Sequence, residues 1–145
     1  MHSKRLKPLH AVAQRHEDDA VKRYVNHQEQ LRRHELRLSE LEAYVAEYSR
    51  MPSQTQDMLQ VRVRREFVER LRGVVKMQLS VVQQARAACE QERTRWLAAH
   101  RSTEVLDKLA AQYRARELRA ADRIAQRETD DIATQLWRSL QGGAP

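Results

Sequence analysis

The chain is 145 residues long, about the length of one domain, and 32% of its residues are charged while only 5% are aromatic. Its three glycines, three prolines and single phenylalanine exclude a large globular core, and the abundance of Ala, Glu, Gln, Arg and Leu is typical of long helices. The formal net charge of +7 favours acidic partners such as nucleic acid, anionic lipid or an acidic protein face, although arginines that merely solubilise a helix give the same balance.

The N-terminal and cysteine patterns predict a soluble, cytoplasmic protein. The opening MHSKRLKPLH is basic but lacks the apolar region of a signal peptide, and no stretch approaches the 18 or so apolar residues of a membrane span. Cys89 is the only cysteine, which rules out an intrachain disulfide framework. We expect Cys89 to be a small buried hydrophobe rather than a nucleophile.

The first predicted helix covers about residues 9–50, with Pro8 in its first turn. Two columns of residues spaced at sevens predict a coiled-coil seam on it. One column is Leu6, Ala13, Ala20, His27, His34, Leu41 and Tyr48, and the other is Glu17, Tyr24, Leu31, Leu38 and Val45. His27 and His34 lie about 10 Å apart along such a helix, too far to share a metal ion, so we interpret them as polar seam residues.

A turn is predicted at about residues 51–53, where Pro52 ends the first helix. Ser53 and Gln56 have the spacing of a capping box, which predicts a second helix from about residue 54 to about 139. A short turn makes the two helices antiparallel. The sequence therefore predicts an all-α fold, an antiparallel two-helix coiled coil in a single domain of residues 1–145, with the second helix longer than the first. Folding back at Pro52 places Pro8 near residue 96, where the seam should fade.

The stretch from Met58 to Trp96 carries more apolar residues than one seam needs. Val61, Val68, Val75, Val82, Cys89 and Trp96 form one strict column at sevens, which we expect to close the hairpin. Phe67, Val74, Val81 and Ala88 form a second column, with Leu71 beside it. We interpret this surplus column as a functional face; a wider seam or self-association is the alternative. Gly73 marks either a close approach by a partner or a mild bend.

Beyond Trp96 the apolar pattern becomes weak. Leu106, Leu109, Tyr113, Ala120, Ile124 and Ile132 keep a loose stripe, and Arg116, Arg119, Arg123 and Arg127 make a basic ridge at helical spacing. We expect an overhang that is either a solvated helix or a segment that docks into another protein. Gly142 and Gly143 are expected to end it.

No pattern of catalytic or metal-binding chemistry is present in the sequence. The chain has no glycine-rich phosphate loop, no HExxH and no paired cysteines. We therefore predict no catalytic residues, no metal site, no cofactor and no small-molecule substrate, and hence no enzyme.

Several stretches together resemble the FliJ family of flagellar export proteins. LHAVAQRHEDDAVKRY and QLRRHELRLSELEAYVAEY are similar to the family's first helix, with Tyr44 and Tyr48 as its tyrosine pair. REFVERL, Trp96 and the charged KLAAQYRARELRAADRIAQRETDDIA are similar to its second helix. The resemblance covers about residues 5–135. The turn lacks the family's usual glycine, and Gly73 falls inside the proposed functional face.

The resemblance implies a component of the flagellar type III export apparatus, which serves flagellum biogenesis, motility and chemotaxis. Such proteins bind the export ATPase ring, the cytoplasmic domain of the export-gate membrane protein and empty export chaperones. They lie in the cytoplasm, at the inner membrane only through these partners. The family's partner-binding positions correspond to Leu41, Tyr44, Tyr48, Phe67, Leu71, Val74 and Gln78.

Two alternatives remain open from the sequence. One is a basic coiled-coil scaffold or nucleic-acid-binding protein that uses the ridge from Arg116 to Arg127, although the aromatic residues of specific readers are missing. The other is the equivalent stalk protein of a virulence type III secretion system.

Overall fold

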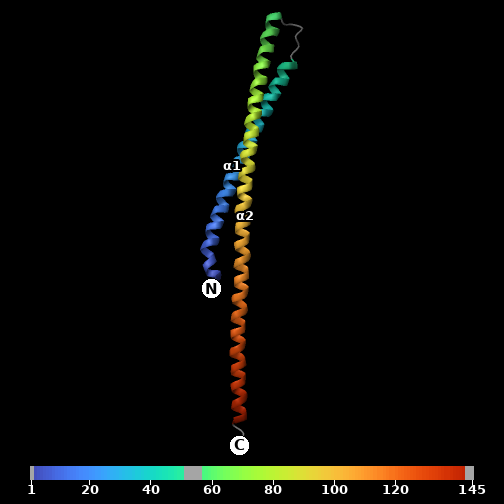
Figure 1. Ribbon diagram of the computed structural model, residues 1–145. Coiled ribbons are helices and arrows are strands. Elements are labelled where there is room, and N and C mark those ends of the chain that lie inside the picture. Colours follow the sequence, from blue (N-terminus) through green and yellow to red (C-terminus); the bar gives the residue numbers. More distant parts are fainter. Residues whose placement is uncertain (1, 51–56, 143–145) are drawn as a thin grey trace. The chain divides into compact units, whose positions relative to one another are not determined.

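The computed structural model describes residues 2–50 and 57–142, and every described residue except Asp57 is helical. The two helices are α1 (His2–Arg50) and α2 (Met58–Gly142), which pack side by side in opposite directions (Figure 1). The prediction of an all-α, antiparallel two-helix fold with a longer second helix is confirmed. None of the described helices is long and apolar enough to cross a membrane.

The described chain divides into two units. The central unit comprises residues 16–99, and the terminal unit comprises residues 2–15 together with residues 100–142. Each unit contains part of α1 packed on part of α2. The single domain of residues 1–145 remains a prediction.

Helix α2 begins at Met58 because Asp57 caps it. The Asp57 side chain accepts a hydrogen bond from the Gln60 amide at 2.8 Å, and its carbonyl accepts one from the Val61 amide at 3.1 Å. An aspartate in this role satisfies an amide that the helix itself leaves without a partner. The helix thus starts later than the predicted residue 54 and reaches Gly142 rather than 139. The predicted turn at residues 51–53 and the capping pair Ser53 and Gln56 lie outside the described residues.

Helix α1 begins at His2, not at about residue 9, and contains Pro8 in its interior. Proline has no amide hydrogen, so the bond that residue 8 would donate to the Lys4 carbonyl is lost. Contacts with α2 on both sides of Pro8 offset this loss. The Ser3 amide and hydroxyl donate to the Glu117 carboxylate at 3.1 and 2.6 Å, and the His10 ring pairs with Asp107.

In the central unit, the predicted columns of α1 face α2. Ala20 is the most buried residue of α1, at 3% exposure. Half-buried seam residues follow it at alternating steps of three and four: Tyr24, His27, Leu31, His34, Leu38, Leu41, Val45 and Tyr48. Tyr24 meets Trp96 of α2 edge-on, with ring centroids 5.9 Å apart. The seam on α1 therefore has the predicted heptad pattern.

The seam on α2 has two columns, of which the sequence revealed one. The predicted column is inward, with Val82 fully buried and Val68 and Cys89 each 7% exposed. The second column is Leu71, Gln78, Ala85, Glu92 and Ala99, all buried or half-buried. Gln78 and Glu92 concealed this column, because polar residues are not expected at seam positions.

The predicted register between the helices is wrong. In the terminal unit, His10 pairs with Asp107 and Ser3 bonds to Glu117, so packing reaches Glu117 instead of fading near Trp96. The cause lies in the central unit, where Tyr48 packs against Phe67. A fold-back at Pro52 would instead bring Tyr48 beside a residue much nearer in sequence than Phe67.

Candidate partner-binding face

An apolar face on α2 lies beside the seam in the central unit. Phe67 and Val74 are each 44% exposed, and Val81 is 36% exposed. Leu59, Val63 and Met77 continue this line at steps of three and four residues, with exposures of 68%, 57% and 71%. We call these six residues the partner face. The polar Arg70 interrupts this line between Phe67 and Val74, and the other positions of the line are apolar.

Sequence reasoning found Phe67, Val74 and Val81 but missed Leu59, Val63 and Met77. Those three break the strict spacing at sevens, while they keep the broader helical spacing of three and four. A search for helical rather than heptad spacing would have found them.

Helix α1 supports the face through Tyr48. Its ring contacts Phe67 edge-on, with centroids 5.1 Å apart and an interplanar angle of 71°. Tyr48 is half-buried in the seam, so it holds one edge of the Phe67 ring while the remainder stays exposed. A partner would meet a side chain whose position is already fixed.

Tyr44 of α1 lies on the same flank of the helix pair as the partner face. Val45 and Val75 help to line an apolar hollow on the opposite flank. Tyr44 directly precedes Val45, and Val74 directly precedes Val75, so each is rotated by about 100° around its helix, away from that hollow. Because the helices are antiparallel, both rotations lead to the same flank of the pair. Tyr44 is 52% exposed there. A shallow hollow of about 410 Å³ beside it on α1 is lined by Arg33, Leu36, Arg37, Glu40, Leu41 and Tyr44.

The remaining residues implied by the resemblance are seam residues. Leu41 and Leu71 are half-buried between the helices. Gln78 is 9% exposed, and its side-chain amide donates to the His34 carbonyl at 3.0 Å. These seam residues hold the two helices together, whereas Tyr44, Phe67 and Val74 are exposed at the surface.

Gly73 lies on α2 beside Val74 and has ordinary helical geometry. No glycine of the described chain has a positive φ, and a Cβ added at Gly73 would meet nothing within 4 Å. Neither a bend nor a close approach within the described chain requires glycine here.

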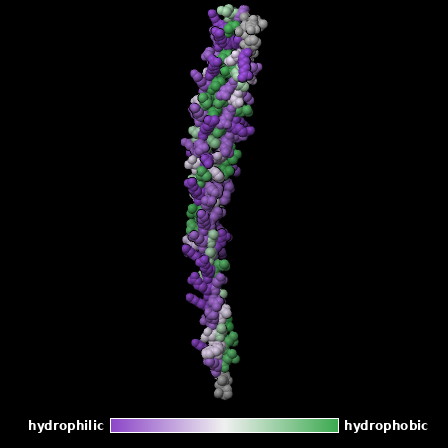
Figure 2. Space-filling model, turned by 90° about the vertical axis from the view of Figure 1, so that its right-hand side faces the viewer, coloured by the Kyte–Doolittle hydropathy of each residue, from purple (hydrophilic) through white to green (hydrophobic). Residues whose placement is uncertain are grey.

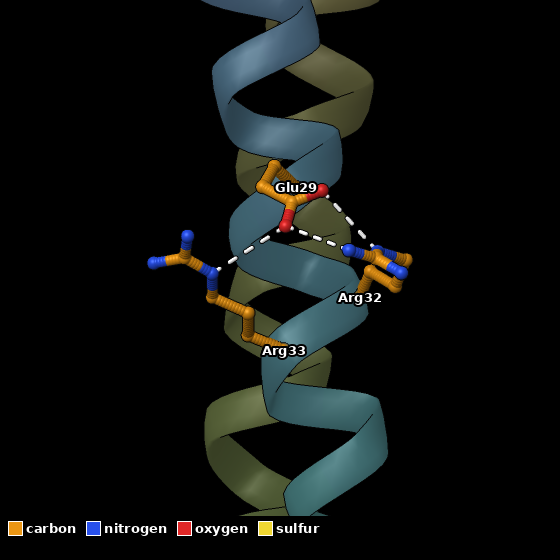
Figure 3. A network of polar contacts seen from close by, with 3 residues as sticks. All are labelled: Glu29, Arg32 and Arg33. Atoms are coloured by element: carbon orange, nitrogen blue, oxygen red, sulfur yellow. Dashed lines mark hydrogen bonds and ion pairs between the residues drawn. The ribbon is translucent and has the colours of Figure 1, made fainter.

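A charge network on the exposed side of α1 is internal to that helix. Glu29 accepts hydrogen bonds from the Arg32 guanidinium at 2.8 and 3.2 Å and lies 3.5 Å from Arg33 (Figure 3). The hydrogen bond from Arg32, together with the positive charges of both arginines, lowers the pKa of Glu29. The single carboxylate neutralises only one of the two arginine charges. This turn of α1 therefore keeps a net positive charge beside the hollow near Tyr44.

Between the helices of the central unit lies a second charged group, Glu92. It is only 7% exposed, and one oxygen accepts a hydrogen bond from Arg95 at 3.0 Å. His27 lies 3.9 Å from the same oxygen. The other oxygen is buried and has no hydrogen-bond partner in the described part of the chain. A half-satisfied carboxylate at a seam position weakens the local packing.

The terminal unit has an open groove of about 460 Å³ between its two helices. Its lining includes Lys4, Lys7 and Arg114, with Asp107 as a carboxylate. Across residues 2–50 and 57–142, no three potential metal ligands come together. The groove therefore offers cations to an acidic partner and no set of ligands for a metal.

The last turns of α2 are exposed in the terminal unit. The expectation that the helix overhangs from about Trp96 is partly wrong, because Leu106, Leu109 and Tyr113 of the loose stripe are half-buried. The His2 and Tyr113 rings lie 5.3 Å apart. Arg116, the first residue of the basic ridge, sits over the Tyr113 ring at 5.8 Å. From Leu118 to Gly142 every residue is exposed, including Leu136 at 61% and Trp137 at 60%.

Comparison with known protein families is consistent with this arrangement of helices. The profile of a family described as Flagellar FliJ protein matches residues 2–142, almost the whole chain. The chain belongs to the FliJ family. Comparison with curated proteins gave no match, and comparison with solved structures gave none either. Membership associates this FliJ-family chain with flagellar protein export and confirms the resemblance found in the sequence.

Proposed function

We propose that this FliJ-family chain is a non-enzymatic coupling protein of the flagellar type III export apparatus. Its partner face and Tyr44 bind the cytoplasmic domain of the export gate and empty export chaperones. The observation that carries this proposal is a stripe of six exposed apolar residues held on a helix whose other face is already packed. Through these partners the protein lies at the cytoplasmic face of the inner membrane.

The size of the face suits reversible binding. Fully burying a side chain such as Phe or Val contributes about 1.5–3 kcal/mol, and half-exposed side chains have about half of that left to gain. The cost of association offsets much of the sum. A handful of such contacts gives the moderate affinity that a protein needs when it must release one partner and bind another.

The exposed end of α2 supports a second contact, with the export ATPase ring. Residues 118–142 offer apolar side chains next to the arginines of the basic ridge, at the part of α2 that α1 does not cover in the terminal unit. This segment is the surface that we propose docks on the ring.

The first test concerns the face. Phe67→Ser with Val74→Ser should weaken binding to the purified gate domain and to an export chaperone at least tenfold in calorimetric titrations. Leu71 is unsuitable for this test because it packs in the seam. The matched control is Leu79→Ser, which changes a residue of similar exposure, 42%, on the other flank of α2. Equal loss in both variants, or none in either, would contradict the proposal.

The second test concerns the end of α2. Leu136→Asp with Leu140→Asp should prevent co-purification with the export ATPase and leave gate binding intact, because these residues belong to the terminal unit and Phe67 to the central unit. Helicity should be unchanged, since both side chains are exposed. Undiminished co-purification of the double variant would show that the ring binds elsewhere.

A further inference from the structure

The positive charge of the chain is concentrated in its terminal unit. Residues 2–15 carry four lysines and arginines and no carboxylate, and residues 100–127 carry seven lysines and arginines against four carboxylates. The central unit, residues 16–99, is almost balanced, with fifteen against thirteen. Residues 2–15 and 100–127 thus have an excess equal to the whole net charge of +7, so they attract an anionic partner more strongly than the rest of the chain does.

The two flanks of the helix pair in this unit can be told apart by the groove. Lys7 of α1 and Arg114 of α2 both line the groove, which marks one flank. A step of two residues turns by about 200° around an α-helix. Leu9 and Arg116, two residues further along each helix, therefore lie on the flank away from the groove.

The Tyr113 ring supports this placement independently. The Arg116 guanidinium lies 5.8 Å from the centroid of that ring, and the centroid of the His2 ring lies 5.3 Å from it. His2 precedes Leu9 by seven residues, about two turns, so the line of α1 through Leu9 meets the line of α2 through Arg116 on one flank. We call the residues of these two lines, spaced by three and four, the amphipathic face: His2, Arg5, Leu9 and Val12 of α1, and Val105, Leu109, Gln112, Arg116 and Arg119 of α2.

The amphipathic face combines aliphatic side chains with arginines. Leu9, Val12 and Val105 are 56%, 64% and 56% exposed, and Leu109 is half-buried. The three arginines of the face are exposed as well. Figure 2 shows hydrophobic side chains gathered close to the C-terminal end of α2, in the segment of residues 118–142 that we propose docks on the ring. The aliphatic residues of the amphipathic face all precede that segment and form a separate surface.

No carboxylate belongs to the amphipathic face. Asp107 lines the groove on the other flank. Glu117 accepts hydrogen bonds from Ser3 at 3.1 and 2.6 Å, and Glu104 lies 3.3 Å from His100. The formal charge of the face therefore comes from its three arginines alone.

This composition fits a lipid surface better than a protein or a nucleic acid. The residues that dominate protein–protein binding are rich in Trp and Tyr, whereas Leu and Val are under-represented among them. Single-stranded nucleic acid is bound largely by stacking of its bases on aromatic rings. The amphipathic face has no Phe, Tyr or Trp, unlike the partner face, which contains Phe67. Surfaces that combine aliphatic side chains with arginines lie in the plane of a membrane, where the cations are attracted by anionic lipids.

We propose that the amphipathic face binds the surface of a membrane that contains anionic phospholipids. The terminal unit lies flat on this surface, with Leu9, Val12 and Val105 at the boundary of the acyl chains and the arginines at the lipid phosphates. Attachment is weak and reversible, because a few aliphatic side chains and three cations are far short of a stable membrane anchor. The partner face takes no part, so the inference does not depend on binding to the gate or to chaperones.

Co-sedimentation of the full chain with lipid vesicles tests the proposal without any protein partner. The protein should bind vesicles of phosphatidylglycerol and phosphatidylcholine and should not bind vesicles of phosphatidylcholine alone. Raising the ionic strength from about 0.01 M to about 0.1 M shortens the Debye length from about 30 Å to about 10 Å, and should weaken binding about tenfold or more. Equal binding to both kinds of vesicle would overturn the proposal, as would a protein that leaves the vesicles unbound and retards duplex DNA in a gel.

Charge reversal on each flank tests which flank meets the lipid. Arg5→Glu with Arg116→Glu should weaken binding to the anionic vesicles about tenfold or more. The matched control is Lys7→Glu with Arg114→Glu, which changes the net charge equally on the groove flank. At about 0.1 M salt the charges of the groove flank are largely screened from the membrane, so the control should weaken binding less than about threefold. An equal effect of the two pairs would overturn the assignment of the amphipathic face.

Serine substitutions test the aliphatic contact without changing any charge. Leu9→Ser with Val105→Ser should weaken vesicle binding about fivefold or more, because two side chains lose their apolar contact with lipid. The matched control is Leu79→Ser with Val25→Ser, which changes one leucine and one valine of the central unit, 42% and 55% exposed. The control should bind as the wild type does, and circular dichroism should show equal helicity in all three proteins. No loss in the first pair, or an equal loss in both, would overturn the proposal.

Discussion

Val81 and Val82 are neighbours of the same residue type on one helix, yet Val82 is fully buried and Val81 is 36% exposed. Each belongs to a column repeated at sevens, and the longer, stricter column through Val82 is the one predicted to close the hairpin. What separates them is α1, whose own narrow seam can cover only one side of α2. The seam column therefore stabilises the fold, while the neighbouring column stays exposed on the surface.

The largest expected effect comes from shortening the buried member of the pair. Val82→Ala should lower the free energy of unfolding by about 2 kcal/mol, because it removes buried methyl groups and leaves a cavity. Val81→Ala should change it by less than about 0.5 kcal/mol. Chemical denaturation followed by circular dichroism measures both. Similar losses in the two variants would place the Val81 column in the fold instead.

Glu92 is a buried polar residue of the seam, so its replacement by an apolar residue is expected to stabilise the protein. Glu92→Leu should raise the free energy of unfolding by about 1 kcal/mol, because an apolar side chain replaces a half-satisfied buried carboxylate. Thermal melting measures the gain, and Glu90→Leu, at an exposed position two residues earlier, is its control. A lower melting temperature for Glu92→Leu would mean that its contacts with Arg95 and His27 stabilise the seam more than apolar packing does.

Gly73 directly precedes Val74 on α2, and a substitution there is expected to have a smaller effect. Gly73→Ala should stabilise the protein by about 0.5–1 kcal/mol, because alanine favours helix and its Cβ has free space. If the same substitution weakens gate binding in titrations, the glycine serves close approach by the partner. Destabilisation would instead show that the local helix needs glycine.

The smallest effect is expected at Glu29, on the exposed side of α1. The pKa of Glu29 is lowered in the folded protein, so its ion pair contributes to folding stability at pH values above the ordinary pKa of glutamate. This contribution is lost as the pH falls through the lowered pKa. The group is exposed and screened by solvent, so Glu29→Gln should leave the melting temperature unchanged within error at neutral pH. A marked drop at neutral pH, absent at strongly acidic pH, would reveal a structural role for this network.

The sequence was sufficient for the elements and for the α1 seam. Apolar columns at sevens, such as those through Leu38 and Val82, and the near absence of glycine and proline allow few structures other than long paired helices. The register, meaning which residues of α1 lie beside which residues of α2, was not predictable, because it depends on where the chain folds back between the two helices. Pro52 suggested an early fold-back, whereas in the structure Tyr48 packs on Phe67.

The candidate site was predictable only in part. Phe67 and Val74 were visible as a surplus column, but Leu71 and Gln78 beside them pack or bond in the seam. Which column of α2 turns inward depends on contacts with α1, and polar seam residues such as Gln78 conceal the companion column. Burial in the structure separates the two where spacing cannot.

The most direct test of the central claim is site-specific photo-cross-linking from the flank of α2. A photoreactive amino acid placed at position 81, in the partner face, should cross-link to the gate domain or to an export chaperone. The same group at position 79, on the other flank, should not. Strong cross-linking from position 79, or none from position 81 in a protein that is folded and binds its partners, would contradict the assignment of the exposed column to partner binding.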